Sequence, residues 1–252
     1  MNNPVSNNVS TLNVLLYGEP IATITNVGND RTLFAFTDAY ANDEARPVLG
    51  LGFKDALGGL ITNFKPTQTK LTPYFSNLLP EETMRNYLAE RASVNPAREF
   101  FLLWVLGQDL AGAITAMPAD GEALPPNVHE EIEEETKYEA PMRFSLAGVQ
   151  LKFSAVQHAS GGLTIPASGT GGSWIVKLPS SRFEAVPENE FAMMEMARML
   201  GMDVPETQLL PIEQIANIPE GIGKFGNSAF AIKRFDRANG QAIHIEDFAQ
   251  VF

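Results

Sequence analysis

The stretch WIVKLPSSRFEAVPENEFAMMEMARML, residues 174–200, contains two different periods of apolar residues. Its first part, 174–178, is a short apolar run that contains one lysine, which is typical of a strand. Its second part repeats apolar residues at helical spacing, begins with a proline and ends just before Gly201, a residue suited to the position after a helix. The stretch predicts a strand followed by an amphipathic helix from about Pro187 to Leu200.

One charged residue in each part points to chemistry. A lysine within an apolar strand is costly to bury unless an anion or a carboxylate meets it, which makes Lys177 a candidate binding residue. Glu190 follows thirteen residues later, near the start of the predicted helix, where its carboxylate could face Lys177. Two plainer explanations stay open: an edge-strand lysine that discourages aggregation, and a glutamate favoured by the helix dipole.

Further strand-like segments surround this stretch. Apolar runs at 153–156, 207–212 (TQLLPI) and 228–235 (SAFAIKRF) alternate with glycine-rich loops at 161–172 and 221–226. We expect the runs at 207–212 and 228–235 to be neighbouring strands. The order strand, loop, strand, strand with lysine, helix, strand, strand is that of the small lobe of a kinase.

An ATP phosphotransferase needs backbone N–H groups over the phosphates, a lysine on the phosphates and an acidic helix residue that holds the lysine. The segment FSLAGVQLKFS, residues 144–154, is the candidate for the first requirement. Ala147 and Gly148 are small enough to let the backbone approach a phosphate, and Lys152 adds positive charge. The segment matches neither GxGxxG nor a Walker motif, so alone it is a weak signal.

The first half of the chain has a different pattern. From about 11 to 64, apolar residues alternate between turns, which predicts a small, mostly antiparallel sheet. Helices are expected at about 74–88, with Pro80-Glu81-Glu82 in a first turn, and at 97–106. Their apolar stripes are interpreted as core. The segment 117–140 is rich in proline and glutamate and indicates an exposed linker, with an acidic docking segment for a basic partner as the alternative.

Composition limits the classes of function. The chain has 252 residues, with 30 acidic and 18 basic side chains and a formal charge of −12. This charge opposes direct binding to nucleic acid. The chain has no cysteine, and we find neither a signal peptide nor a membrane-spanning segment, so we expect a cytoplasmic protein. The predicted fold class is α+β, with an N-terminal unit at 1–116, a linker at 117–140 and a kinase-like small lobe at 141–252.

Five motifs in this order resemble the HipA family of serine/threonine protein kinases, the toxins of type II toxin–antitoxin pairs. They are FSLAGVQLKFS, WIVKLP, PENEFAMMEMARMLGMDVPETQLLP, FAIKRFDR and HIEDFAQVF. The segments YFSNLLPEETMRNYLA and FFLLWVLGQDLAGAITAMP are similar to the N-terminal subdomain of the same family. The resemblance covers nearly the whole chain.

The resemblance implies a role for individual residues. Ala147 to Lys152 would form the phosphate-binding loop, and Ser145 resembles the serine that family members autophosphorylate. Lys177 would be the ATP-phosphate lysine, Glu190 its partner, and 233–235 the hinge whose backbone meets adenine. The implied nucleotide-binding residues are Ala147, Gly148, Val149, Gln150, Leu151, Lys152, Lys177, Glu190, Lys233, Arg234 and Phe235.

The same resemblance implies ATP and Mg²⁺ as cofactors, a HipB-like DNA-binding antitoxin as partner, and a component of the translation machinery, such as an aminoacyl-tRNA synthetase, as substrate. The 252 residues contain no segment like the DGH or DFD motifs of the family, so no catalytic or metal-binding residue is assigned, and the chain alone is expected to be inactive. A truncated gene, a fragment and a split kinase are the open explanations. The alternative function is a non-catalytic subunit that binds an antitoxin or a partner kinase lobe.

Overall fold

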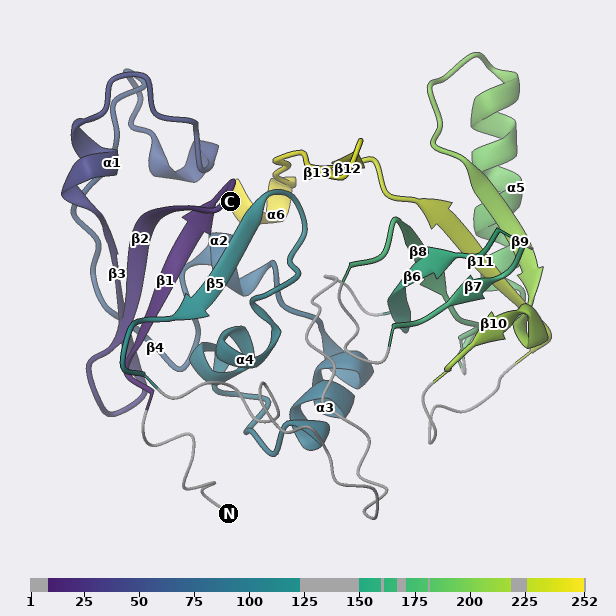
Figure 1. Cartoon of the computed structure of the whole chain (residues 1–252), viewed down its shortest axis with the longest axis horizontal. Helices are drawn as coiled ribbons and strands as arrows, with labels where there is room; N and C mark the ends of the chain where they lie inside the picture. Colours follow the sequence, from purple (N-terminus) through teal and green to yellow (C-terminus); the bar gives the residue numbers. More distant parts are fainter. Residues whose placement is uncertain are drawn as a thin grey trace.

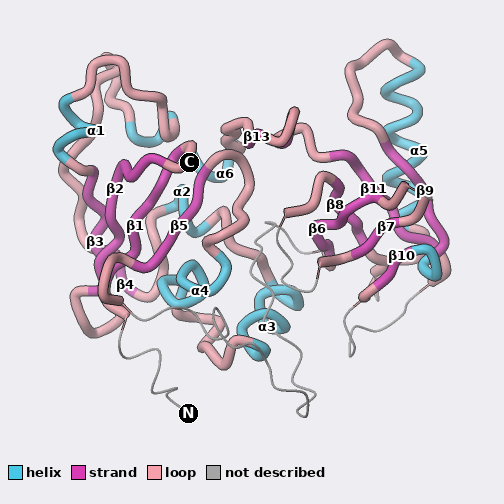
Figure 2. Tube along the Cα trace, viewed as in Figure 1, coloured by secondary structure: helices cyan, strands magenta, loops and turns pink. Residues whose placement is uncertain are grey.

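The computed structural model describes residues 9–122, 150–159, 161–166, 171–180, 182–218 and 226–251. These residues form two large β-sheets with helices, one on each side of the view in Figure 1, and a third sheet of two strands. We call residues 9–122 the N-terminal unit and residues 150–233 the second unit. Both sheets have helices beside them, and Figure 2 shows how strands and loops alternate in each unit. The architecture confirms the predicted α+β class.

The N-terminal unit is built on a five-stranded sheet in the order β4-β3-β2-β1-β5, with every neighbouring pair antiparallel. In β1, buried residues alternate with partly exposed ones, as a strand with one face on the core requires. Tyr17 and Gly18 have positive φ angles and form the two-residue turn into β2. The strands are β1 (Thr11–Leu16), β2 (Glu19–Asn26), β3 (Arg31–Phe36), β4 (Thr67–Gln68) and β5 (Ile114–Pro118).

Helices pack on this sheet and complete the core of the N-terminal unit. All eight residues of α4 are buried, so this helix lies inside the unit, next to β5. Gly107 ends α4 against β5, and a Cβ atom there would clash with the backbone oxygens of Ala116 and Leu103. The helices are α1 (Asp38–Asn42), α2 (Pro73–Ser76), α3 (Glu82–Arg91) and α4 (Glu99–Leu106), with a 3-10 turn, η2, at Leu51–Phe53.

The second unit is built on a six-stranded sheet in the order β10-β7-β6-β8-β11-β9. Its neighbouring strands are antiparallel except for the parallel pair β10 and β7. One row of buried residues, Phe153, Val176 and Ala231, crosses its three central strands. The strands are β6 (Lys152–Gln157), β7 (Leu163–Thr164), β8 (Trp174–Lys177), β9 (Thr207–Pro211), β10 (Ile215–Ala216) and β11 (Ser228–Lys233), and a 3-10 turn, η3, lies at Ile212–Gln214.

A single long helix, α5 (Val186–Met199), packs against β11 and β9 of this sheet. Gly201 follows it with a φ of 81°, the left-handed conformation that commonly ends a helix. The predicted helix at 187–200 and the predicted pairing of the strands around 207–212 and 228–235 are confirmed.

After β11 the chain returns to the N-terminal unit through a hairpin, β12 (Arg237–Ala238) and β13 (Gln241–Ala242), and a final helix, α6 (Phe248–Val251). Figure 1 shows α6 beside α2. Glu246 accepts hydrogen bonds from the backbone N–H of Leu51 at 2.9 and 3.1 Å. The His244 ring nitrogen Nε2 lies 2.7 Å from the carbonyl oxygen of Leu49. The end of the chain is therefore attached to the N-terminal unit rather than to the second sheet.

Some predicted boundaries are wrong. Pro80 and Glu81 precede α3 instead of forming its first turn, because the chain bends between α2 and α3. Helix α4 begins at Glu99, two residues later than predicted, and β7 lies inside the predicted loop at 161–172. Strand β5 extends to Pro118, so the first two residues of the predicted linker belong to the N-terminal sheet. Within the described residues, no helix has the length and apolar character to span a bilayer.

Candidate functional site

Two lysines lie side by side on one face of the second sheet. Lys152 on β6 is directly opposite Lys177 on β8, and Lys177 is directly opposite Phe230 on β11. Directly paired residues point to the same face of a sheet, so the three form a row across its centre. The Lys177 Nζ lies 5.6 Å from the centroid of the Phe230 ring, a cation–π distance. Two adjacent cations on one face favour an anionic ligand.

Glu190 of α5 forms an ion pair with Lys177, through its Oε1 atom and the lysine Nζ. The side chains are 23% and 21% exposed, so the pair is partly shielded from water. The pairing predicted from the sequence is therefore present. Strand β8 lies between β6 and β11, which contradicts the alternative explanation of Lys177 as an edge-strand residue.

The environment of Lys152 disfavours its positive charge. Burial, and then the neighbouring charge of Lys177, lower the pKa of Lys152 from 10.5 to about 8, against the opposing influence of Glu190 and Glu81. The site thus keeps two ammonium groups together at a cost in stability. An anion bound between the two ammonium groups would offset their repulsion and so stabilise the folded protein.

The end of the predicted phosphate-binding loop meets this row. The N–H of Leu178 donates to the carbonyl oxygen of Leu151 at 2.9 Å, and the Gln150 side chain donates to the carbonyl oxygen of Leu178 at 3.0 Å. Gln150, Leu151 and Lys152 therefore lie beside Lys177. The other predicted loop residues, Ala147, Gly148 and Val149, and the predicted autophosphorylation site, Ser145, lie outside the described residues.

The predicted hinge lies at the opposite end of β8 from Lys177. Lys233 ends β11 and is paired with Trp174, three residues before Lys177, which corresponds to about 10 Å along the strand. The N–H of Lys233 donates to Glu206 O and that of Arg234 to Ser173 O, both at 2.8 Å. Phe235 is 65% exposed.

An open hollow of about 640 Å³ adjoins this segment. It is lined by Met194, Asp203, Pro205, Glu206, Ile232, Lys233, Arg234 and Phe235. Because the N–H groups of Lys233 and Arg234 already donate within the protein, a ligand here would meet their carbonyl oxygens or Phe235. The side chain of Lys233 points to solvent, 3.6 Å from Glu206, with both groups more than half exposed.

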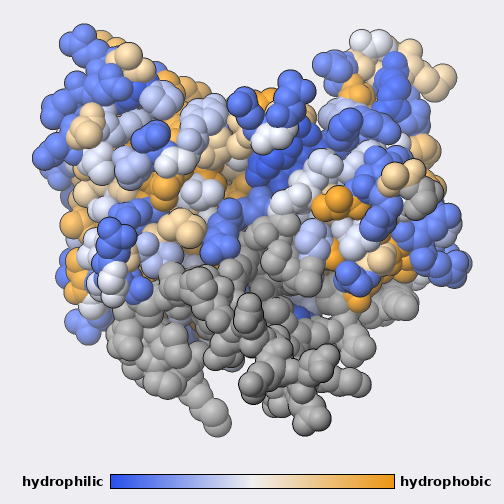
Figure 3. Space-filling model, in the orientation of Figure 1, coloured by the Kyte–Doolittle hydropathy of each residue, from blue (hydrophilic) through white to orange (hydrophobic). Residues whose placement is uncertain are grey.

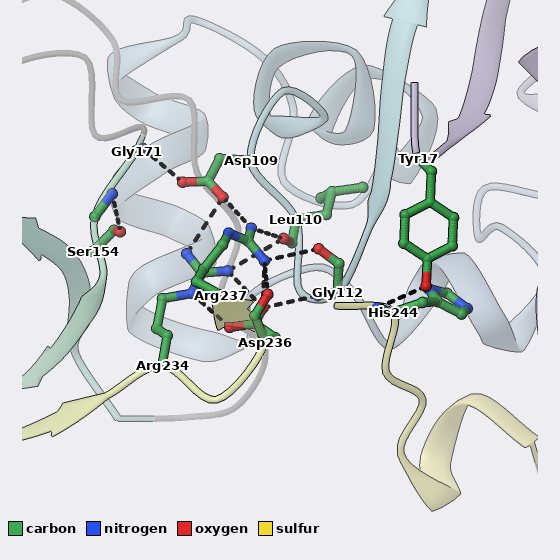
Figure 4. Close-up of polar contacts among 11 residues, drawn as sticks. Tyr17, Asp109, Leu110, Gly112, Ser154, Gly171, Arg234, Asp236, Arg237 and His244 are labelled. Carbon is green, nitrogen blue, oxygen red and sulfur yellow. Dashed lines mark hydrogen bonds and ion pairs between the residues drawn. The ribbon is translucent and has the colours of Figure 1, made fainter. Parts of the chain in front are cut away.

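The side chain of Arg234 turns away from that hollow into a buried salt-bridge cluster formed by Asp109, Arg234, Asp236 and Arg237 (Figure 4). Arg234 donates to both carboxylate oxygens of Asp236, at 2.9 and 2.8 Å. Burial alone would lower the pKa of Arg234, but its bonds to Asp236 and Asp109 outweigh burial and hold it above the ordinary value. The segment after β11 is thus fixed by four charges.

The sequence did not predict this cluster. The motif FAIKRFDR contains three of its members, but their partner, Asp109, is 125 residues from Arg234 in the chain. The sequence does contain one signal of the cluster: two arginines and an aspartate come directly after an apolar strand. If that strand is central, these charged side chains are buried and must have charged or hydrogen-bonding partners.

The described residues at this row carry positive charge. Lys152 and Lys177 supply adjacent positive charge on one face. Among the residues that the structure describes, no group of three or more His, Cys, Asp or Glu side chains could hold a metal ion. The donor set at the row is therefore suited to an anion.

Family models match both halves of the chain: the HipA N-terminal domain over residues 12–117 and the HipA-like C-terminal domain over residues 144–252. The chain belongs to the HipA family. The resemblance seen in the five sequence motifs is thus confirmed, and the two family domains correspond to the two sheets of the structure.

Several relatives in the HipA family are longer than this chain. Two proteins of Sinorhizobium fredii that carry kinase names, Y4dM and Y4mE, are 57% and 31% identical to it and are matched over 97% and 96% of its length. The serine/threonine-protein kinase toxin HipA of Shewanella oneidensis is 30% identical over 69% of the chain. The matched parts are 60%, 59% and 40% of these proteins, so the chain spans about 60% of the first two.

A solved structure supports the fold. The toxin–antitoxin complex of Shewanella oneidensis HipA, HipB and operator DNA contains a chain that matches 92% of this one, with a TM-score of 0.58 and 22% identity. The match covers 53% of that chain. At this identity the match concerns the arrangement of the elements.

Proposed function

We propose that this chain provides the N-terminal unit and the nucleotide-binding small lobe of an ATP-dependent serine/threonine kinase of the HipA type. The observation that carries the proposal is the Lys177–Glu190 ion pair, set beside a second lysine on the same face of the sheet. Lysine and glutamate in this arrangement are the parts that a kinase uses to hold the α- and β-phosphates. Names of kinases among the relatives support the same class.

The residues have separate roles in the proposed site. Lys177 binds phosphate oxygens while Glu190 keeps its side chain in place, and Lys152 adds charge that favours the bound polyphosphate. The segment 233–235 meets the base, through carbonyl oxygens or Phe235, at the other end of β8. Mg²⁺ bound with the nucleotide would neutralise phosphate charge. By the family resemblance, Ser145 is the proposed autophosphorylation site and 147–149 complete the phosphate-binding loop.

The wider function is proposed by analogy with the HipA family. The solved relative is a complex of a toxin with HipB and operator DNA, which supports a HipB-like antitoxin as the partner of this protein. The proposed substrate is a component of the translation machinery, and the proposed compartment is the cytoplasm. The negative net charge agrees with DNA contact being made by the antitoxin.

Calorimetric titration with Mg·ATP tests the proposal without requiring turnover. We expect the full chain to bind and Lys177→Met to lose most of the affinity, because the phosphate contact and the partner of Glu190 are removed together. Lys65→Met is the matched control, since Lys65 is an exposed lysine of the N-terminal unit and the charge change is the same. Binding that is equal in all three proteins, or absent from the wild type, contradicts the proposal. Absent binding favours the non-catalytic interaction subunit.

A further inference from the structure

The salt-bridge cluster joins the N-terminal unit to two segments at the hinge end of β8. Asp109 belongs to the N-terminal unit and is only 8% exposed. One of its carboxylate oxygens, Oδ2, accepts from the N–H of Gly171 at 3.0 Å. The other, Oδ1, accepts from Arg237 at 2.9 Å and lies 3.4 Å from Arg234. Figure 4 shows Asp109 between these two segments.

The two segments that Asp109 contacts are neighbours at the hinge end of β8, where the N–H of Arg234 donates to the carbonyl oxygen of Ser173. Gly171 lies three residues before β8, the strand that ends in Lys177. Gly172 beside it donates to the Ser154 hydroxyl of β6 at 3.0 Å, so this turn is also attached to the strand that carries Lys152. Arg234 and Arg237 lie after β11, where the base is proposed to bind. One carboxylate therefore holds the entry to the lysine strand and the proposed hinge.

Asp109 is anchored in a well-packed part of the N-terminal unit. It follows α4, whose eight residues are buried, and the carbonyl oxygen of Gly107 accepts from the N–H of Ala116 in β5 at 2.7 Å. On the other side, the N–H of Gly112 donates to Asp236 at 2.9 Å, and the carbonyl oxygen of Gly112 accepts from Arg237 at 2.8 Å. Movement of Asp109 relative to the hinge would break several buried bonds together.

The charges in the cluster balance, with two carboxylates and two guanidinium groups. Removal of the Asp109 charge leaves two arginines with one carboxylate in a buried place, which is strongly unfavourable unless the chain moves. The segments free to move are the turn before β8 and the segment after β11, because Asp109 lies on the core of the N-terminal unit. Figure 3 shows hydrophilic surface in the middle of this face, between the two units.

We propose that Asp109 is a positioning residue for the nucleotide site, through which the N-terminal unit holds the turn before the lysine strand and the hinge segment in place. This inference rests on the proposed function and extends it: the N-terminal unit becomes a determinant of nucleotide affinity without touching the nucleotide. Any partner that shifts the N-terminal unit would change that affinity through the same contacts.

The test compares Asp109→Asn with Glu99→Gln by Mg·ATP calorimetry well below the unfolding temperature. Glu99 is the matched control, because it is also a buried carboxylate, with bonds to Leu71, Ser76 and Arg85, all within the N-terminal unit. We expect Asp109→Asn to raise the Kd roughly tenfold, as coupling between sites commonly does. Glu99→Gln is expected to lower stability and leave the Kd unchanged.

Hydrogen exchange gives a readout that a general loss of stability would not produce. In Asp109→Asn we expect faster exchange in 171–177 and 231–237 only, and in Glu99→Gln no change there. If Asp109→Asn does not fold, Arg237→Lys replaces it in the test. This variant keeps the positive charge but cannot contact Asp109 and Asp236 with two guanidinium nitrogens at once. Its Kd should rise by a smaller factor. Wild-type binding with an unchanged Kd in the folded variant overturns the inference alone. No binding by the wild type overturns the proposed function and this inference with it.

Discussion

Replacement of Lys152 by methionine should make the protein more stable and its phosphate site weaker. The pKa of Lys152 is lowered from 10.5 to about 8, by burial and by the charge of Lys177. At about 1.4 kcal/mol per pH unit, this difference sets an upper value of about 3.5 kcal/mol for the cost of the charged lysine. The side chain is partly exposed, so we expect a gain of about 1–2 kcal/mol in the free energy of unfolding at pH 7.

The pH dependence of the free energy of unfolding shows whether the charge of Lys152 is the cause of the gain. Between pH 8 and 10.5 the unfolded state holds the Lys152 proton more tightly than the folded state, so the free energy of unfolding of the wild type rises with pH through that interval. The gain from Lys152→Met should be full below pH 8 and should disappear toward pH 10.5. Urea unfolding at a series of pH values measures it, with Lys65→Met as the exposed-lysine control.

The same variant should bind Mg·ATP about tenfold more weakly, because one of two charges that face the phosphates is lost. If Lys152→Met is less stable than the wild type at pH 7, or if its gain in stability stays constant up to pH 10.5, the buried charge of Lys152 is not what destabilises the wild type. Unchanged ATP affinity would show that Lys152 faces no phosphate.

Three further effects follow from buried contacts. Glu99→Gln should lower the free energy of unfolding by about 2–4 kcal/mol in urea titrations, because its bonded arginine is left without a buried carboxylate. Gly172→Ala should cost about 2 kcal/mol or more, since a Cβ atom there would clash with the Ser154 hydroxyl, and thermal unfolding measures the loss. Burial would raise the pKa of Asp236, but hydrogen bonds from Arg234 outweigh burial and lower this pKa. The ionised carboxylate therefore stabilises the fold above about pH 4, and this stabilisation is lost as the pH falls through the folded-state pKa. The stability gap between the wild type and Asp236→Asn should accordingly narrow in acid unfolding below pH 4.

The sequence predicted the parts of the fold that depend on local periodicity. Helix α5 and the strand that carries Lys177 follow from apolar spacing within about fourteen residues, and the pairing of Lys177 with Glu190 follows from their positions in those two elements. The loop at 147–152 was predicted from family resemblance and stays a prediction, because 147–149 lie outside the described residues. The interruption between α2 and α3 was missed, because the apolar spacing continues through a bend of the chain.

The salt-bridge cluster could not be predicted for a physical reason. Asp109 and Arg234 meet only when the two sheets have both formed, and no local pattern in either segment encodes the partner. The same applies to the attachment of 244–250 to the N-terminal unit, in which Glu246 meets a backbone N–H 195 residues away. Contacts of this kind require the tertiary structure.

Hydrogen exchange with and without Mg·ATP gives the sharpest test of a nucleotide site at Lys177 and Glu190, because it locates the ligand as well as detecting it. We predict slower exchange on nucleotide addition in 150–152, 174–178 and 233–235, with the N-terminal sheet unchanged, and no such change in Lys177→Met. Protection confined to the N-terminal unit, or the same protection in Lys177→Met, would contradict a nucleotide site built on Lys177 and Glu190.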